Sequence, residues 1–362
     1  MKYINHKFLL AVLIVSVFFS CKKFTEIENI ELQPPKVGSE AYYENLRAYK
    51  KSDHAVAFGW FGGWTAQGPD KSGYLASLPD SVDMISLWGA GFNYTQAQLD
   101  DLKFVQQTKG LKVMLCWIIQ TIGDQLEQYK MEDGRQVRTI FVNQDSADVV
   151  KYARAILDTI NKYNLDGFDI DFEPNFGAPG NLAGPTGGST ANRKNFEIFV
   201  KELSKELGPK SGTDKLLVID GEPQSIASYL GEYFNYFIVQ AYYESSPARY
   251  DARINTTRHL HGFSTKKYIV AEDFERYTPT HATPGGSRQN VSAFRVPIDP
   301  IDYVDRNATN PQVPALIGMA YWNPVDGRKG GVGAYHMEYE YTNNPDYKFL
   351  RRAIQIMNPA PY

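Results

Sequence analysis

The sequence predicts a single-domain (β/α)₈ barrel. Short runs rich in apolar residues recur through most of the 362-residue chain. Most of these runs are almost continuously apolar, as parallel strands covered on both faces are. Helical patterns occupy several of the intervals between them, and the chain length is normal for an α/β barrel. We therefore expect an active site at the carboxyl ends of the strands.

Eight segments are predicted as barrel strands from their apolar runs. They are residues 54–59, 82–88, 111–118, 165–172, 216–221, 236–242, 267–272 and 315–321. The clearest helix is 146–163, where Val149, Ile156 and Ile160 recur at helical spacing. Further helices are expected at 193–207 and around 40–50.

Two long connections interrupt the regular alternation. Residues 174–192 are rich in Gly, Pro, Ser and Thr and follow the fourth predicted strand directly. Residues 275–312 form a polar connection before the eighth. Long loops in a compact domain tend to be functional or mobile, although surface decoration explains the second equally well. The glycine-rich stretch 184–190 lacks the lysine of a phosphate-binding loop, so no nucleotide site is expected there.

The first 20 residues indicate a signal peptide. Lys2 and Lys7 precede an apolar run over 8–19, which is shorter than the roughly 20 residues that a membrane-spanning helix needs. The run resembles a bacterial lipoprotein lipobox, with Phe18 at the usual leucine position, a departure tolerated in Bacteroidetes-like lipoproteins. This implies that Cys21 becomes the lipidated N-terminus. A plain secretory signal with a chance cysteine is the alternative.

The predicted organisation is therefore a signal peptide at 1–20, a lipidated stalk and N-terminal helix at 21–50, and a catalytic barrel at 51–362. We expect the protein in the bacterial cell envelope, anchored by lipid at Cys21 to the outer membrane, with the periplasmic or surface face left open. Apart from Cys21, Cys116 is the one cysteine, so the mature chain forms no internal disulfide.

Composition excludes several classes of protein. A hydrophobic fraction of 43% with 22% charged residues describes a soluble globular protein with a core, and excludes disorder, collagen and multi-span membrane proteins. The net charge of −3 gives no basic footprint for nucleic acid. An aromatic share of 14% suits sugar binding and a large core equally well.

The segment 165–174 carries the strongest functional signal. Asp169, Asp171 and Glu173 alternate with apolar residues, and alternate residues of a strand share one face. Their carboxyl groups should point into the barrel at intervals of roughly 7 Å. Buried like charges are costly unless they share protons and hydrogen bonds. An edge strand with a solvated acidic face is disfavoured, because the opposite face of the segment is strongly apolar.

With Asp166, these acids resemble the D-x-x-D-x-D-x-E signature of glycoside hydrolase family 18, which includes chitinases and endo-β-N-acetylglucosaminidases. The resemblance extends over about 52–357 and implies a barrel with this signature on its fourth strand. It also implies retaining hydrolysis assisted by the acetamido group of the substrate. Glu173 would be the general acid, Asp171 would hold the acetamido group, and Asp169 would share a proton with Asp171. Asp166 is expected to be a structural turn residue.

Simple electrostatics agrees with these implied roles. A carboxyl group beside another carboxylate has a raised proton affinity, so Glu173 can remain an acid near neutral pH. The positively charged oxazolinium-like intermediate needs a nearby negative charge, which Asp171 can supply.

The segment 239–243 is similar to a second motif of the family, in which a tyrosine hydroxyl contacts the acetamido carbonyl. Tyr242 takes this position, with Gln240 on the same face. Many chitinases have methionine and aspartate where this chain has Gln240 and Tyr243. A tyrosine of the core is the alternative for Tyr242, and Glu244 is a weaker candidate for substrate contact.

Tryptophans near the predicted strand ends are candidates for sugar binding. Trp322 matches a family tryptophan beneath the reactive sugar, and Trp60 and Trp64 follow the first strand; core packing is the alternative for each. The acids that could line the cleft are Glu222, Glu272 and Asp273.

The sequence predicts no cofactor and no metal. His259 and His261 could align on a strand, but no carboxylate or cysteine cluster lies near them in sequence. The expected partner is a carbohydrate, and three functions stay open. They are an endo-β-N-acetylglucosaminidase acting on N-linked glycans, a chitinase-type enzyme, and a non-catalytic glycan-binding protein. The presence of Glu173 disfavours the third.

Overall fold

A computed structural model of the protein describes residues 38–91, 93–126, 129–176, 180–182, 189–276 and 288–359. The chain divides into two compact units, Met1–Tyr42 and Tyr43–Tyr362, and the second contains the whole barrel. The predicted signal peptide, Cys21 and most of the stalk lie outside the described residues. None of the described helices has the length and apolarity needed to cross a membrane.

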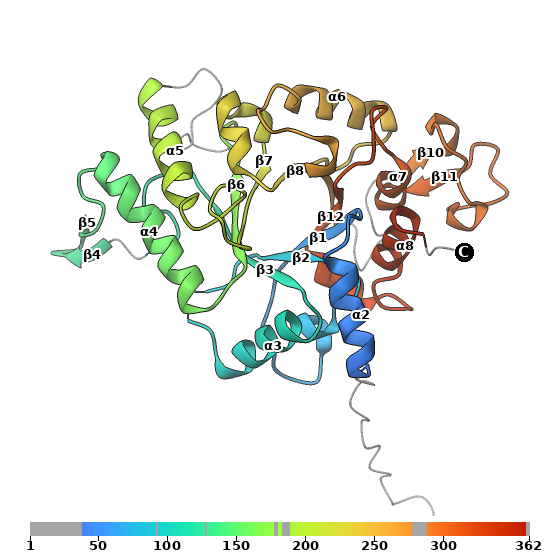
Figure 1. The fold of residues 1–362 in the computed structure, drawn as a ribbon, viewed down its shortest axis with the longest axis horizontal. Helices are drawn as coiled ribbons and strands as arrows, with labels where there is room; N and C mark the ends of the chain where they lie inside the picture. The colour runs from blue at the N-terminus through green and yellow to red at the C-terminus, as the bar shows by residue number, and fades with distance from the viewer. Residues whose placement is uncertain are drawn as a thin grey trace, which may run out of the picture. The chain divides into compact units, whose positions relative to one another are not determined.

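Eight parallel strands close into a barrel in the second unit, which confirms the predicted (β/α)₈ fold (Figure 1). Around the barrel the strand order is β1-β12-β9-β8-β7-β6-β3-β2. The strands are β1 Val56–Phe61, β2 Met84–Leu87, β3 Lys112–Ile118, β6 Gly167–Phe172, β7 Leu216–Gly221, β8 Tyr236–Gln240, β9 Tyr268–Asp273 and β12 Gly331–Tyr335.

Helices surround this barrel (Figure 1). The α-helices are α2 Glu40–Lys50, α3 Gln96–Gln107, α4 Ser146–Lys162, α5 Thr190–Leu203, α6 Pro247–Thr257, α7 Ala315–Tyr321 and α8 Lys348–Met357. The 3₁₀ turns are η1 Lys71–Gly73, η2 Leu75–Ser77, η3 Pro223–Ser225, η4 Ser228–Tyr233, η5 Thr265–Lys267, η6 Val291–Ala293, η7 Pro300–Asp302 and η8 Met337–Thr342. Helix α4 has nearly the bounds expected from sequence. It begins where the Asp145 side chain accepts hydrogen bonds from two backbone N–H groups.

Two short antiparallel pairs decorate the barrel. Strands β4 Tyr129–Glu132 and β5 Arg135–Arg138 form a hairpin between β3 and α4. Strands β10 Arg288–Asn290 and β11 Gln312–Pro314 pair within the long connection that follows β9. The second connection expected from sequence therefore contains structure of its own.

The predicted eighth strand at 315–321 is wrong, because this segment is helix α7 and the eighth barrel strand is β12. Residues 315–320 are all buried, so the helix lacks the polar face that would reveal its period. Strand β12 was missed because its sequence, Gly-Val-Gly-Ala-Tyr, is poor in strand-forming residues. Glycine is needed there, since a Cβ atom on Gly331 would lie 2.0 Å from the carbonyl oxygen of Val56.

Two apolar cores lie on opposite faces of the barrel strands. One fills the barrel interior and includes Phe58, Met114 and Ile238. The larger one lies between the strands and the helices. Strand β6 sends Ile170 and Phe172 outward into the larger core. Its other face turns Asp169 and Asp171 inward, as the alternation of the sequence predicts.

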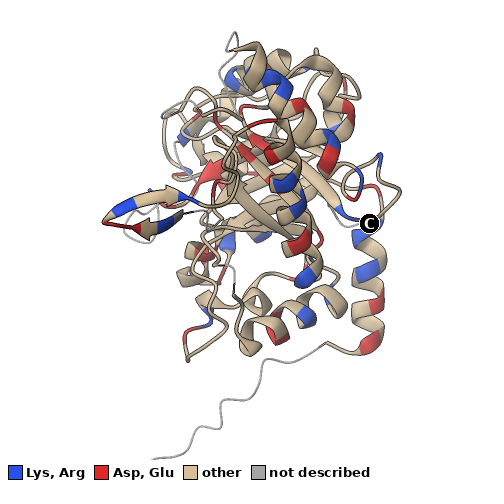
Figure 2. Cartoon of the chain, turned by 90° about the vertical axis from the view of Figure 1, so that its left-hand side faces the viewer, with Lys and Arg blue, Asp and Glu red and all other residues tan. Residues whose placement is uncertain are grey.

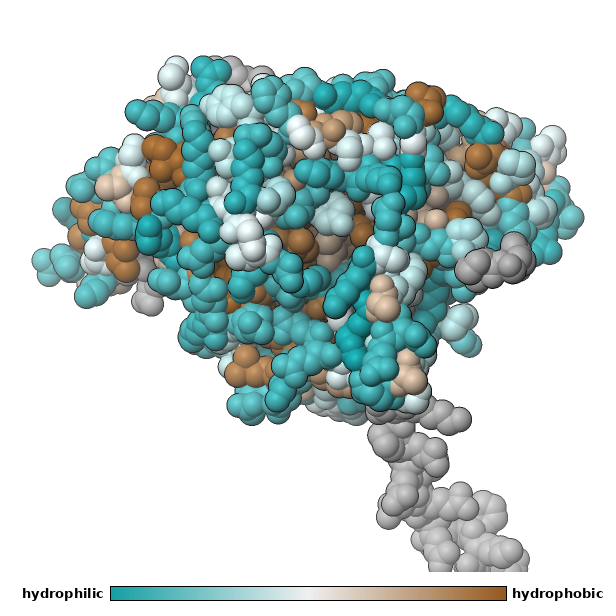
Figure 3. Space-filling view, viewed as in Figure 1, coloured by the Kyte–Doolittle hydropathy of each residue, from teal (hydrophilic) through white to brown (hydrophobic). Residues whose placement is uncertain are grey.

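The outer surface is polar and mixed in charge. The face seen in Figure 3 is mainly hydrophilic, with small hydrophobic areas scattered over it. Figure 2 shows basic and acidic residues interspersed along the helices. The concentration of acids at the carboxyl ends of the barrel strands is therefore a local feature.

Candidate active site

A cavity of about 600 Å³ lies at the carboxyl ends of the barrel strands. Seven of the eight strands contribute a residue at or just beyond their last position, and β1 contributes Trp60, one residue before its end. This is where barrel enzymes place their active sites. The lining residues are Trp60, Trp88, Ile118, Asp171, Glu173, Phe176, Gly221, Glu222, Gln240, Tyr242, Tyr243, Arg253, Asp273 and Tyr335.

Glu173 is the first residue beyond β6 and lies half-buried in the cavity wall. Burial raises the pKa of its carboxyl group. A hydrogen bond with Gln240 opposes this shift, while the negative charge of Glu222 adds to it. The net shift is upward, which keeps a larger fraction of Glu173 protonated near neutral pH than an exposed glutamate would be. This carboxyl group can therefore donate a proton to a bound molecule.

Asp171 lies two residues earlier on the same face and is 4% exposed. Burial, the charge of Glu173 and the charge of Asp169 raise its pKa well above the usual range, while a hydrogen bond with Asp220 opposes them. Its Oδ1 atom is buried and has no hydrogen-bond partner among the described residues. The cavity thus offers a buried acceptor for an N–H or O–H group of a ligand.

Asp169 lies deeper and is completely buried. Its Oδ2 atom accepts hydrogen bonds from Trp60 Nε1 at 3.1 Å and from Ser86 Oγ at 2.6 Å. Burial raises its pKa to about 6, although hydrogen bonds from Ser86, Asp220, Cys116 and Trp60 oppose the shift. These bonds fix the orientation of the carboxyl group inside the barrel.

Asp220, which was not predicted as a site residue, completes the buried group of acids. It ends the apolar run of β7, and the strand register places it opposite Asp171. Burial and the charges of Asp171 and Asp169 raise its pKa well above the usual range. Gln240 Nε2 donates to its Oδ1 atom at 3.0 Å. Three adjacent buried carboxyl groups cannot all be ionised, so they must share protons.

Tyr242 lies two residues beyond β8, and its ring stacks on Tyr335 with 6.2 Å between centroids. Burial and the charges of Asp220 and Asp171 raise the pKa of its phenol well above the usual range. The hydroxyl therefore stays protonated and can donate a hydrogen bond into the cavity. Gln240 shares this wall, as the sequence predicts.

A family model described as glycoside hydrolase family 18, BT1044-like, matches residues 20–356 of the chain. The chain belongs to glycoside hydrolase family 18. Its acidic signature, which runs from Asp166 to Glu173, accordingly spans the fourth barrel strand in sequence, β6.

Three known proteins show how far the similarity extends. Endo-beta-N-acetylglucosaminidase F2 of Elizabethkingia meningoseptica is 28% identical over 386 residues, covering 99% of this chain and 100% of the relative. The solved structure of a selenomethionine-labelled glutamate-to-glutamine variant of BT1044 is 34% identical, with a TM-score of 0.74, over 88% of this chain and 93% of that one. An endo-beta-N-acetylglucosaminidase from Cordyceps militaris, in its apo form, is 21% identical with a TM-score of 0.60, over 89% and 97% of the two chains, and shares the fold.

Aromatic rings form one side of this family 18 cavity. Trp60, on β1, is 2% exposed and meets Tyr335 edge-on with 6.4 Å between centroids. Trp88, just beyond β2, meets the same ring at 5.7 Å. Neither Trp88 nor Tyr335 was predicted. Trp88 could have been found from its position at the end of the second predicted strand. Tyr335 could not, because its strand, β12, was not recognised in the sequence.

Trp64 and Trp322 do not line the cavity. Trp64 Nε1 donates to Asp101 Oδ2 at 2.9 Å, and Trp322 Nε1 donates to Asp251 Oδ1 at 3.1 Å. Both rings are buried in the core between strands and helices. The placement of Trp322 at the end of an eighth barrel strand is wrong, since it follows helix α7. In this family 18 chain, Tyr335 occupies the end of the true eighth strand.

The remaining predicted acids divide between cavity and core. Glu222 and Asp273 line the cavity. Glu272 is completely buried beside it, and its Oε1 atom accepts hydrogen bonds from the backbone N–H groups of Tyr243 and Asp273. Glu244 lines a smaller neighbouring pocket instead.

Asp166 lies before β6, as a structural residue would. It accepts a hydrogen bond from the backbone of Val113 and pairs with Lys112. Of the loop 174–192, Phe176 reaches the cavity, whereas 177–179 and 183–188 lie outside the described residues. In the connection 275–312, residues 277–287 are likewise outside them.

Among the described residues, one group could offer ligands to a metal. Cys116, Asp169 and Asp220 have side-chain atoms within 4.8 Å of one another. Burial, followed by the charges of Asp169 and Asp220, raises the pKa of the Cys116 thiol well above its usual value. The thiol is therefore a neutral hydrogen-bond donor to Asp169, whereas a metal ligand would be a thiolate.

Proposed function

We propose that this glycoside hydrolase is an endo-β-N-acetylglucosaminidase that cuts between the two core GlcNAc residues of N-linked glycans. The observation that carries the proposal is the pairing of Glu173, whose pKa is raised, with Asp171, whose buried Oδ1 atom is unpartnered in the same cavity. Relatives with this activity in their names, matched along nearly the whole chain, support the choice of substrate.

In the proposed reaction, the acetamido group of the substrate is the nucleophile. Glu173 donates its proton to the glycosidic oxygen as the bond from that oxygen to the anomeric carbon breaks. The acetamido carbonyl oxygen forms a new bond to the same carbon, giving a cyclic oxazolinium ion. Asp171 accepts a hydrogen bond from the acetamido N–H, and the Tyr242 hydroxyl donates to the acetamido oxygen. Both groups would hold the reacting atoms in line.

The second half of the reaction restores the enzyme. Water attacks the anomeric carbon, the ring of the intermediate opens, and the carboxylate of Glu173 takes the proton of the water. Two displacements at one carbon retain the β configuration. The buried neighbours Asp169 and Asp220 support this step, because protons shared among them allow Asp171 to carry the negative charge that the cationic intermediate needs.

The aromatic wall provides the surface for the sugar ring. The C–H faces of a pyranose pack favourably on aromatic rings. Trp60 lines the cavity and is fixed by its hydrogen bond to Asp169. We propose that it supports the reactive GlcNAc, with Trp88 and Tyr335 beside it.

The first experiment compares three substrates. The protein is incubated with high-mannose glycoprotein, complex glycoprotein and chitin oligomers, and the products are identified by mass spectrometry. We expect protein carrying a single GlcNAc and a released glycan ending in GlcNAc. Cleavage of chitin oligomers alone would favour the chitinase-type reaction, and no turnover would favour a glycan-binding protein. Conversion of Asn to Asp would indicate an amidase.

A second experiment tests the role of the acetamido group. A thiazoline analogue of the cyclised intermediate should inhibit, because it resembles the species that the site stabilises. A substrate with glucose in place of the reactive GlcNAc should not be cut. Retained activity on that substrate, or an α-anomer as the first product, would contradict the mechanism.

We also propose that the protein is a lipoprotein of the outer membrane, anchored through Cys21. The short apolar run before this cysteine supports the proposal.

A further inference from the structure

A second pocket of about 300 Å³ adjoins the catalytic cavity. Arg253 lines both, so the two spaces meet at this side chain. Four carboxylic acids line the catalytic cavity, and among the described lining residues Arg253 is the one basic residue. The second pocket is lined by Gln224, Glu244, Arg249, Ala252, Arg253 and Thr256.

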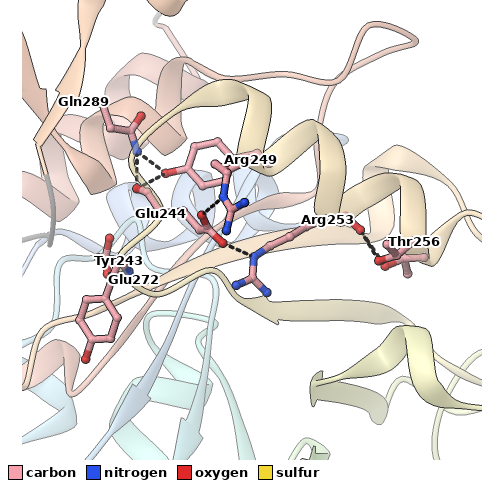
Figure 4. Close-up of polar contacts among 9 residues, drawn as sticks. Tyr243, Glu244, Arg249, Arg253, Thr256, Glu272 and Gln289 are labelled. Atoms are coloured by element: carbon pink, nitrogen blue, oxygen red, sulfur yellow. Dashed lines mark hydrogen bonds and ion pairs between the residues drawn. The ribbon is translucent and has the colours of Figure 1, made fainter. Parts of the chain in front are cut away.

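Glu244 orients the two arginines of the second pocket (Figure 4). Arg249 Nε donates to Glu244 Oε2 and Arg253 Nε donates to Glu244 Oε1, each at 2.8 Å. Burial would raise the pKa of Glu244, but the hydrogen bonds from the arginines hold it below its ordinary value. With one carboxylate and two guanidinium groups, the pocket carries a net positive charge.

Buried groups fix the backbone that carries Glu244. Its carbonyl oxygen accepts hydrogen bonds from Gln289 Nε2 at 3.1 Å and from the Tyr250 hydroxyl at 3.4 Å. Both donors are fully buried. The preceding residue, Tyr243, has a φ of 64°, a left-handed conformation that is costly for a bulky side chain. Its N–H donates to Glu272. The structure thus holds Glu244 in one position.

The terminal nitrogens of Arg253 point away from Glu244 in Figure 4. Within the described part of the chain they make no hydrogen bond to another protein group, and the side chain is 38% exposed. Glu244 is buried, so its carboxylate needs charged donors, but the Nε atoms of the two arginines supply them and leave the terminal nitrogens of Arg253 available to a ligand. A guanidinium fixed through Nε presents two parallel N–H donors, which match a pair of adjacent oxygen acceptors.

We propose that Arg253, oriented by Glu244, forms a subsite for a sugar in the outer part of the glycan. It would bind adjacent oxygen acceptors, which are either neighbouring hydroxyl groups or the carboxylate of an acidic sugar. The inference rests on the proposed function, since the catalytic cavity must hold the GlcNAc that is cut. The second pocket then receives the chain that extends from it. Glu244 is a positioning residue in this subsite.

The test uses one N-glycan substrate in its intact form and in forms trimmed stepwise to the core. Arg253→Met keeps the length of the side chain and removes its donors. On the intact glycan we expect KM to rise about tenfold or more, the usual effect of losing hydrogen bonds to a charged group, with a much smaller change in kcat. The rise should shrink with each trimming step, because the lost contact is no longer available to the substrate.

Arg258→Met is the matched control. Arg258 is the C-cap of the same helix, α6, pairs with Asp326 at 2.7 Å, and is 32% exposed, close to the value for Arg253. It lines neither pocket, and we expect its kinetics to match the wild type. Comparison of sialylated and desialylated glycans separates the two ligand types. A larger effect on the sialylated form indicates a carboxylate, and an equal effect indicates hydroxyl groups.

The role of Glu244 is tested by a double-mutant cycle. Glu244→Gln should raise KM for the intact glycan in the wild-type background and change little when Arg253 is already Met. A purely structural role would make the two effects additive and lower the unfolding temperature in both backgrounds. Additive effects would therefore overturn the positioning role.

Two results would overturn the subsite. One is an equal loss on intact and trimmed glycans in Arg253→Met, and the other is no loss at all. If the wild type cuts none of these substrates, the proposed function fails separately. Calorimetric binding of the intact and trimmed glycans to wild type and Arg253→Met then decides the subsite, and equal affinities would reject it.

Discussion

Asp171 and Asp220 lie opposite each other across the β6–β7 pair, and each has one buried carboxyl oxygen without a partner among the described residues. The hydrogen bond from Asp220 lowers the pKa of Asp171, whereas burial and the neighbouring charges raise it. Asp220 therefore favours the charged form of the residue that we propose stabilises the intermediate. Gln240 in turn fixes Asp220 through its Nε2 atom.

Substitution of Asp220 should separate hydrogen bonding from charge. Asp220→Asn retains an N–H donor for Asp171, whereas Asp220→Leu keeps the size and loses the donor. We expect Asp220→Leu to lower kcat about tenfold more than Asp220→Asn does, which corresponds to ~1.4 kcal/mol of transition-state stabilisation. Steady-state kinetics with thermal unfolding of both variants measures this. Equal kcat values in two folded variants would remove Asp220 from the mechanism.

Glu173→Gln should abolish proton donation while keeping the shape of the site. The loss of a general acid typically lowers the rate by about 10²- to 10⁴-fold. Glycan binding, measured by calorimetry, should be retained. Asp171→Asn should also be severely impaired, because the intermediate loses its charged partner. Near-normal turnover by Glu173→Gln would disprove its assignment as the acid.

The alkaline limb of the pH–rate profile should report Glu173. Since the protonated form is the active one, activity falls as the pH rises through its raised pKa. Burial is the main cause of that shift and the negative charge of Glu222 adds to it. Glu222→Gln should therefore move the alkaline limb of kcat/KM to lower pH. If the midpoint of the alkaline limb does not move, even where the maximal kcat/KM changes, then Glu222 does not influence the pKa of Glu173.

Glu272 should make stability depend on pH. Burial raises its pKa from 4.5 to about 8, although two backbone hydrogen bonds oppose the shift. The folded state therefore holds a proton that the unfolded state releases, and its stabilising effect is lost as the pH rises from 4.5 through about 8. Glu272→Gln keeps an acceptor oxygen and cannot ionise. Denaturant unfolding should show that the variant loses less stability than the wild type between pH 5 and pH 9. This interval covers most of the range over which the pKa shift of Glu272 acts. Parallel losses would contradict this.

Cys21→Ser tests the lipid anchor. Without the thiol no lipid can be attached, so the variant should leave the membrane fraction or remain unprocessed. Fractionation followed by mass spectrometry of the N-terminus distinguishes these results. Equal membrane association of the variant and the wild type would reject the lipoprotein proposal.

Several features of the site could be predicted because they depend on short-range periodicity. Alternation along β6 places Asp169 and Asp171 on one face whatever the rest of the chain does. Gln240 and Tyr242 were also expected together, and both line the cavity, although Tyr242 lies in the turn after β8. The barrel followed from the apolar runs, seven of which overlap observed barrel strands. Helix α4 followed from its amphipathic repeat.

The sequence by itself determined the acidic face of β6 and the alternation of strands with helices, because both are local patterns. Only the tertiary structure decided that β12 closes the barrel and that α7 is a helix, since a fully buried apolar run has no period to show. It also decided that Trp64 and Trp322 pack in the core, that Tyr335 and Arg253 line the cavity, and that Asp220 lies opposite Asp171. Barrel closure pairs strands that are distant in sequence, such as β1 and β12, and a local sequence pattern carries no information about such pairing.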